Sequence, residues 1–431
     1  MKTDAGDTAI RDRYRGCLVG GAAGDALGYA VEFASEREIF ARHGSRGITR
    51  YELDDRGLAP FSDDTQMTLF TANGLLLGTT RGMTRGIMGS YPSYVSCCYR
   101  DWYRTQTERY PLSEGYPGPR RYSWLAGVPE LFARRAPGTT CLEACRAGAE
   151  GTPEHPVNHS KGCGGVMRVA PVGLYFSCGP RVRAESGADR AIWERSERAC
   201  HEVHPEEERA SAVGHRLVPQ PSASAMVQRL GAEVAALTHG HELGWLSAGM
   251  LAHIVSRLAH DPASTVREAV EDAVETLPFA YPRTRHVPGL LALVRRAMTL
   301  AASGRSDLDA IHELGEGWVA EETLAIAVFC ALRYADDIAG ALVAAVNHGG
   351  DSDSTGAVAG NIVGAHVGLA GIPSAFTERL ELRDLIVGVA DDLFDDCQIG
   401  DRTDSPDGVW EHKYIERDYV AWDAAGRPRR C

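Results

Sequence analysis

The chain has 431 residues, of which 44% are hydrophobic and 24% charged, ordinary values for a globular protein with a sizeable core. Its formal net charge is −13, from 45 basic and 58 acidic residues, which argues against general nucleic-acid binding by phosphate neutralisation. The eleven cysteines include no CxxC pair, so we expect a reduced, cytoplasmic protein without structural zinc. We predict neither a signal peptide nor a membrane span, because the N-terminal residues are charged and no apolar run is long enough.

An apolar segment, residues 16–33, places a glycine at every fourth position. Asp25 interrupts this run, and we interpret it as a buried carboxylate that hydrogen-bonds to backbone or to a polar side chain and supports a nearby site. Glu32 near its end is either an ordinary helix-end charge or a residue facing a cleft. The spacing puts the glycines on one helix face, where a second helix can approach closely; they are Gly16, Gly20, Gly24 and Gly28.

The first acidic cluster is Ser-Asp-Asp-Thr at residues 62–65. It follows a turn-rich stretch, residues 34–60, that we interpret as a surface loop. The apolar spacing after the cluster is helical, so the cluster begins a helix, where Ser or Asp is also a good cap. Capping explains one such residue but not two adjacent carboxylates between hydroxyls, so we favour a metal site.

The second acidic cluster lies far along the chain, in Asn-His-Gly-Gly-Asp-Ser-Asp-Ser-Thr at residues 347–355. Its carboxylates, Asp351 and Asp353, follow a glycine pair at which the backbone can turn and direct oxygen ligands at a hard cation. We expect Asn347 and His348 to set this turn. Glycines then recur at a spacing of four, which predicts that the two glycine-spaced helices pack together beneath one site; they are Gly356, Gly360, Gly364 and Gly368.

Three further segments carry polar residues of interest. Glycines in residues 158–174 leave backbone amides accessible to a diphosphate or a ribose, although this loop is neither a dinucleotide fingerprint nor a Walker loop. We expect His239 to contact a ligand or to support the metal site through a hydrogen bond, because acidic clusters favour oxygen coordination. Glu321 and Glu322 lie in the first turn of a helix, where the helix dipole explains them as well as catalysis does.

No convincing β alternation occurs, which predicts an all-α protein: a compact, orthogonal multi-helix fold in a single domain, residues 1–431. Residues 178–227 are highly charged with few apolar positions, which predicts a surface insertion. Two helices are expected in residues 262–312, around a PFAYPRT turn. Residues 398–431 form a polar C-terminal extension.

Taken together, these motifs resemble those of the ADP-ribosylglycohydrolase family, of the type that includes ADP-ribosylarginine hydrolases and dinitrogenase reductase-activating glycohydrolases. The glycine motif alone is weak evidence, whereas the two acidic motifs in this order are specific. The matching segments are GDALGYAVEF at 24–33, FSDDTQMTLF at 61–70, SKGCGGVMR at 160–168, ALTHGH at 236–241, GWVAEETLAIAVFC at 317–330 and NHGGDSDSTGAVAGNIVGA at 347–365.

The resemblance implies an all-helical fold with two Mg²⁺ or Mn²⁺ ions at a site that binds the distal ribose of ADP-ribose. By motif match, Glu32 corresponds to a mobile acidic residue that covers the site in some relatives, and His239 to a ligand-contacting histidine. Cys163 stands where the family often has Asn. The implied metal ligands are Ser62, Asp63, Asp64, Asp351, Asp353 and Ser354, and the implied substrate loop is Ser160, Lys161, Gly162, Cys163 and Gly164.

The expected reaction is hydrolysis of the bond between ADP-ribose and an acceptor, with an arginine guanidinium on protein as the favoured acceptor. Asp63 or Asp64 is the expected general base, and Asp353 and Glu32 complete the catalytic set. A non-catalytic ADP-ribose binder and a nucleotide phosphohydrolase remain alternatives, as do serine, nucleic-acid and small-molecule linkages. We expect a monomer acting on ADP-ribosylated protein or small molecules, with neither a membrane nor a nucleic acid as partner.

Overall fold

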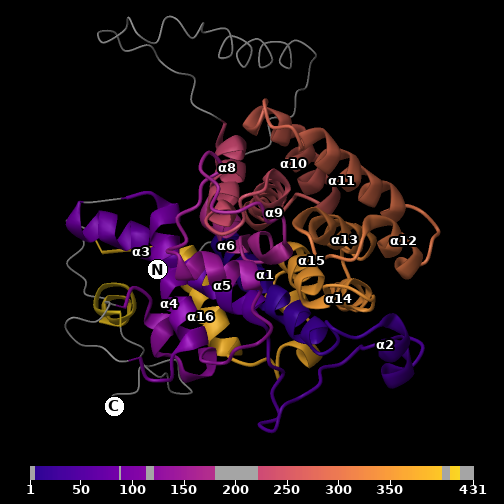
Figure 1. Cartoon of the computed structure of the whole chain (residues 1–431), viewed down its shortest axis with the longest axis horizontal. Helices are drawn as coiled ribbons and strands as arrows, with labels where there is room; N and C mark the ends of the chain where they lie inside the picture. The colour runs from indigo at the N-terminus through magenta and orange to yellow at the C-terminus, as the bar shows by residue number, and fades with distance from the viewer. Residues whose placement is uncertain (1–4, 87–88, 113–120, 180–221, 400–407, 418–431) are drawn as a thin grey trace, which may run out of the picture.

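The computed structural model describes residues 5–86, 89–112, 121–179, 222–399 and 408–417, which form helices and loops (Figure 1). These ranges contain no strand, and only isolated bridges pair extended backbone there. The predicted all-α fold is confirmed. The α-helices are α1 (Ala5–Tyr29), α2 (Glu36–His43), α3 (Asp63–Arg85), α4 (Tyr91–Thr107), α5 (Thr139–Arg146), α6 (Ala170–Tyr175), α8 (Ala223–Ala236), α9 (Glu242–His260), α10 (Val266–Ala280), α11 (Val287–Ala301), α12 (Asp307–Leu314), α13 (Ala320–Arg333), α14 (Ile338–Val346), α15 (Ser352–Val367), α16 (Arg383–Asp395) and α17 (Gly408–Trp410), with shorter turns η1 (Trp124–Gly127), η2 (Pro129–Leu131), η3 (Cys163–Gly165), η5 (Leu369–Gly371), η6 (Ser374–Phe376) and η7 (Glu411–Glu416).

The glycine face of α1 packs directly against that of α15 in the interior of the molecule (Figure 1). A Cβ atom added at Gly24 would lie 1.9 Å from the carbonyl oxygen of Gly356, and one added at Gly360 would lie 2.0 Å from that of Gly20. Any side chain at these positions would force the two backbones apart. The predicted close packing of the two glycine-spaced helices is therefore confirmed.

The two helices run antiparallel, because the later glycines of α1 meet the earlier residues of α15. A Cβ atom added at Gly28 would lie 2.2 Å from the carbonyl oxygen of Ser352. The end of α1 therefore lies against the start of α15, where the second acidic cluster is found. Helix α3, which starts at the first cluster, contacts both helices. The helix packing thus brings the two clusters to one place.

Two segments differ from the sequence prediction. Residues 34–60, predicted as a loop, contain α2, which begins with a reciprocal capping box between Ser35 and Glu38. Residues 262–312 hold three helices rather than two, because Ser306 caps the additional helix α12. Both helices span only 8 residues. Apolar periodicity is weak over such a length, so the caps are the stronger signal.

The predicted insertion, residues 178–227, and the predicted extension, residues 398–431, lie largely outside the described residues. Helix α8 begins at Ala223, so the last residues of the predicted insertion belong to a helix packed on α9. None of the described helices is long and apolar enough to cross a membrane.

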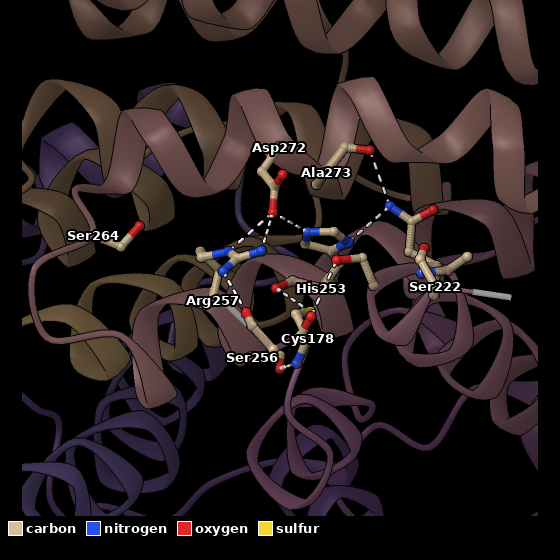
Figure 2. Close-up of polar contacts among 12 residues, drawn as sticks. Cys178, Ser222, His253, Ser256, Arg257, Ser264, Asp272 and Ala273 are labelled. Carbon is tan, nitrogen blue, oxygen red and sulfur yellow. Dashed lines mark hydrogen bonds and ion pairs between the residues drawn. The ribbon is translucent and has the colours of Figure 1, made fainter. Parts of the chain in front are cut away.

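A buried polar network joins α9 to α10 beside Cys178 and Ser222 (Figure 2). The Oδ2 atom of Asp272 accepts hydrogen bonds from Nε and Nη2 of Arg257 at 2.9 and 2.6 Å, and lies 2.8 Å from Nε2 of His253. Burial alone would raise the pKa of Asp272, but its contacts with His253 and Arg257 lower it. This carboxylate is therefore compensated by the groups around it.

Candidate functional site

Each acidic cluster lies at the N-terminus of a buried helix. The Oγ atom of Ser62 caps α3 by accepting a hydrogen bond from the amide of Asp64 at 3.2 Å. The Oδ1 atom of Asp351 caps α15 by accepting one from the amide of Ser354 at 3.3 Å. The positive end of each helix dipole favours negative charge at these positions. The prediction that the first cluster begins a helix is confirmed.

Asp25 of α1 holds the first cluster in place. Its Oδ1 atom accepts a hydrogen bond from the amide of Ser62 at 2.8 Å, and its Oδ2 atom accepts from the amide and the hydroxyl of Thr65 at 2.9 and 2.5 Å. Burial, followed by the charge of Asp353, raises the pKa of Asp25 to about 7. Asp25 has the supporting contacts that the sequence predicts for it.

The tertiary structure gathers five acidic side chains into what we call the acidic site: Glu32, Asp63, Asp64, Asp351 and Asp353. Burial, followed by the charge of Asp353, raises the pKa of Asp63, Asp64 and Asp351 well above the usual value. Burial, followed by the charges of Asp353 and Asp351, raises the pKa of Glu32 to about 10. Residues from the turn after α1, the start of α3 and the start of α15 therefore act on one another electrostatically.

Several oxygen atoms of the acidic site find no hydrogen-bond donor in the described part of the chain. They are Oε2 of Glu32, Oδ2 of Asp63 and Oδ2 of Asp64, all buried. Uncompensated buried charge is costly, and divalent cations that prefer oxygen ligands would balance it.

The donor atoms are of the kind that Mg²⁺ or Mn²⁺ binds, although no three His, Cys, Asp or Glu side chains among the described residues are already arranged to hold a metal ion. The ligand atoms are all oxygens, because the hydroxyls of Ser62 and Ser354 neighbour the carboxylates in the sequence, and hard divalent cations prefer oxygen ligands.

The predicted substrate loop lies beside the second cluster. The Sγ atom of Cys163 is 2.8 Å from Oδ2 of Asp351, which makes the thiol a donor to that carboxylate. The amide of Cys163 donates to the carbonyl of Trp318 at 3.3 Å, and the amide of Gly162 donates to Oγ of Ser160 at 3.3 Å. These two amides are therefore engaged within the protein, which differs from the expectation that the loop leaves its amides accessible.

Lys161, the charged residue of the substrate loop, forms an ion pair with Glu321 in the first turn of α13. The neighbouring Glu322 accepts hydrogen bonds from the amides of Glu316 and Gly317 at 3.0 and 3.2 Å. Both glutamates therefore have structural contacts, in line with the reading of them as residues of a helix first turn.

His239 lies beneath the substrate loop. A Cβ atom added at Gly164 would lie 2.8 Å from Cε1 of His239 and 2.6 Å from Sγ of Cys141, so only glycine fits there. The Nδ1 atom of His239 is 2.8 Å from Oγ1 of Thr238. Burial, followed by the charge of Arg168, lowers the pKa of His239 to about 3, so the ring is neutral.

Arg168 is a fully buried cation to which the sequence analysis assigns no role. Its Nη2 atom donates to Oγ1 of Thr238 at 2.5 Å, and its guanidinium carbon lies 4.6 Å from the centre of the Tyr99 ring. Through Thr238 it connects the substrate loop to His239. A single arginine within the apolar run Val-Met-Arg-Val-Ala was the signal available, because a buried arginine needs polar or aromatic partners.

Asn347 and His348 make the contacts expected of residues that hold a turn. The Oδ1 atom of Asn347 accepts from the amide of Ile48 at 2.7 Å, and its Nδ2 atom donates to the carbonyl of Ile48 at 2.9 Å. The Nε2 atom of His348 lies 3.0 Å from Oγ1 of Thr355. The turn that carries Asp351 is thereby tied to the segment around Ile48 and to the first turn of α15.

Comparison with known proteins assigns the class to which this fold and acidic site belong. A family model described as ADP-ribosylglycohydrolase matches residues 6–212 and 208–402. The chain belongs to the ADP-ribosylglycohydrolase family, and it is a glycosidase that acts on ADP-ribose linkages.

Two individual relatives match over most of their length. ADP-ribosylhydrolase ARH3 of Bos taurus is 23% identical over 400 residues, which cover 88% of this chain and 91% of the relative. A solved structure described as an ADP-ribosylglycohydrolase-related protein complex has a TM-score of 0.53 and 22% identity, and the match covers 90% of this chain and 99% of that chain. The likeness to this structure is a likeness in fold.

Proposed function

We propose that the protein hydrolyses the bond between ADP-ribose and an arginine side chain of a protein, in a reaction that depends on two Mg²⁺ or Mn²⁺ ions. The observation that carries this proposal is the set of buried carboxylate oxygens on Glu32, Asp63 and Asp64 that find no donor among the described residues. A non-catalytic relative is expected to lack some of the carboxylates, and this chain retains each of them. The proposed substrates also include small molecules to which ADP-ribose is attached.

The proposed ligand atoms come from the two helix N-termini. Divalent cations bound there would orient the ribose hydroxyls and lower the pKa of a water molecule. The residues that would hold them are Ser62, Asp63, Asp64, Asp351, Asp353 and Ser354.

The chain's own residues then act on the water and on the sugar. Asp63 or Asp64 accepts a proton from the water that attacks the anomeric carbon. Asp25 positions this general base, because both of its oxygens hold the backbone of the turn that carries it. With cations balancing the carboxylates, Asp353 and Glu32 would place negative charge beside the carbon at which positive charge develops as the glycosidic bond breaks.

The loop Ser160 to Gly164 is proposed to contact the ribose and the diphosphate. Lys161, which is paired with Glu321, lies on this side of the site, and the neutral ring of His239 supports the loop from below. We place the reaction in the cytoplasm and on a monomer, without a membrane or nucleic-acid partner.

A panel of defined ADP-ribose linkages, incubated with Mg²⁺, Mn²⁺ or a chelator, tests the proposal. Intact ADP-ribose is the expected product, and it forms only with a metal ion present. AMP together with ribose phosphate would instead identify a phosphohydrolase. The variants Asp63→Ala and Asp351→Ala are expected to lose turnover and metal dependence, and full activity in either one would contradict the site assignment.

A further inference from the structure

Two large aromatic side chains are exposed beside the acidic site. Phe33 is 76% exposed and Trp318 is 39% exposed. Their rings are stacked, with centroids 6.2 Å apart and planes inclined by 21°. Exposed aromatic surface of this size is unfavourable in water, so a stacked pair at the surface is a mark of a binding site.

Each ring is attached next to a residue of the acidic site. Phe33 follows Glu32, on whose carboxyl the charges of Asp353 and Asp351 act. Trp318 follows Gly317, where an added Cβ atom would lie 3.4 Å from the Cβ atom of Asp351. The aromatic pair therefore joins the turn after α1 to the loop before α13.

The second connection of Trp318 is to the substrate loop. Its carbonyl accepts the amide of Cys163, and the amide of Ala320 donates to the carbonyl of Lys161 at 2.9 Å. The backbone that carries Trp318 is therefore bonded to the predicted substrate loop on one side and packed against Asp351 on the other.

A cavity of about 350 Å³ lies beside Phe33. The residues that line it include two aromatic residues, Tyr29 and Phe33, and two acidic residues, Glu32 and Glu38. Arg42 also lines it, but the charge of Arg42 is paired with a glutamate, Glu52. Aromatic faces combined with carboxylates are the surroundings that a planar cation prefers.

We propose that Phe33, Trp318 and this cavity form the acceptor subsite, in which the guanidinium of an ADP-ribosylated arginine stacks on the aromatic pair. This inference rests on the proposed hydrolase function and names the residues that select its acceptor. The adenine ring is the other planar group of the substrate, but two phosphates and two riboses separate it from the bond that breaks. The pair adjoins Glu32 and Asp351, at the end where the bond to the acceptor lies.

The test compares arginine-linked with serine-linked ADP-ribose peptides in the Mg²⁺-loaded enzyme. Phe33→Ala and Trp318→Ala are expected to raise KM for the arginine linkage about 2- to 30-fold, the range of a single cation–π contact, with little change in kcat. Trp318→Phe keeps a ring and should restore most of the affinity. Met83→Ala, which removes another side chain that is 50% exposed, serves as the matched control.

Inhibition by free ADP-ribose shows whether the aromatic pair binds the acceptor or the adenine ring. We expect the inhibition constant for ADP-ribose to stay unchanged in all variants, and any activity on the serine linkage to fall less than the activity on the arginine linkage. Weaker ADP-ribose inhibition with equal losses on both linkages would overturn the proposal in favour of adenine stacking. Unchanged KM for the arginine linkage, or wild-type activity on serine linkages alone, would also overturn it. Failure of the wild type to release ADP-ribose from any linkage would instead reject the proposed function itself.

Discussion

The buried carboxylates of the acidic site and the partly buried carboxylate of Asp272, whose side chain is 13% exposed, have opposite surroundings. Asp272 faces the guanidinium of Arg257 and the ring of His253, and its pKa is lowered (Figure 2). Asp63 and Asp64 face other carboxylates, and burial, followed by the charge of Asp353, raises their pKa values. A carboxylate compensated by its own chain has a structural role, whereas one left uncompensated by its neighbours has the chemistry to hold an external cation.

A second compensated carboxylate supports the acidic site from outside. Glu381 is buried and forms ion pairs with Arg56 and Arg135. Arg135 also donates to the carbonyl of Phe61 at 2.9 Å, and its own carbonyl accepts the amide of Asp63 at 3.2 Å. Through Arg135, the compensated carboxylate of Glu381 thus helps to hold the backbone that carries the uncompensated carboxylate of Asp63.

Removing one carboxylate from each region is expected to give the largest contrast in activity. Asp351→Asn should lower kcat/KM by more than about 100-fold, because even the partners of metal ligands change activity by 10- to 100-fold. Its melting temperature without metal should stay the same or rise, since one of several repelling charges is lost. Asp272→Asn is the matched control, and its folded fraction should keep full activity. Equal activity losses in the two variants would contradict the distinction between a metal-binding carboxylate and a structural one.

The same control variant is expected to give the largest loss of stability. Asp272→Asn leaves Arg257, which is 2% exposed, without its carboxylate. The free energy of unfolding should fall by about 3–5 kcal/mol, the usual effect of breaking a buried ion pair. Denaturant unfolding measures it, with Asp336→Asn as the reference, because the side chain of Asp336 is 96% exposed and its ion pair with His366 contributes little. A loss no larger than that of the reference would show that the ion pair between Asp272 and Arg257 contributes little to stability.

Removing the metal ions is expected to lower the free energy of unfolding only through their loss from the acidic site. At a free Mg²⁺ or Mn²⁺ concentration 100 times Kd, binding to the folded state alone adds about 2.7 kcal/mol to the free energy of unfolding. Thermal unfolding with and without a chelator measures this difference. In Asp63→Ala the difference should disappear, whereas in Asp272→Asn it should remain. A chelator effect of equal size in Asp63→Ala would place the metal elsewhere.

The smallest expected effect is a dependence of stability on pH from His253, which faces Asp272, Arg257, Gln228 and Cys178. Burial alone would lower the pKa of His253, but Cys178 and Asp272 raise it to about 9. The folded protein therefore holds this proton more tightly than the unfolded chain does. Its contribution to stability is complete below about pH 6.5 and is lost as the pH rises through about 9.

Unfolding of metal-loaded wild type and His253→Gln between pH 6.5 and 9 measures this contribution. The wild type should lose more stability over this range than the variant, with a slope of at most about 1.4 kcal/mol per pH unit for a single proton. Parallel curves for the two proteins would show that the ring is neutral in the folded state.

Motifs in which neighbouring residues act together could be read from the sequence. The four-residue glycine spacing predicted the close packing of α1 and α15, because a helix repeats its face nearly every four residues. The helical start after residues 62–65 and the supporting contacts of Asp25 were also predicted. The short helix α2 has a capping box that is visible in the sequence, but the turn-rich composition around it favours a loop.

The helical class and the glycine faces follow from residue type and local spacing, which also supply the acidic residues of the two clusters. Which charges are compensated depends on tertiary packing. Lys161 pairs with Glu321, Arg168 lies under Tyr99, and Phe33 stacks on Trp318 across separate segments. Such contacts depend on how the helices pack, and local spacing carries no record of partners more than 60 positions apart.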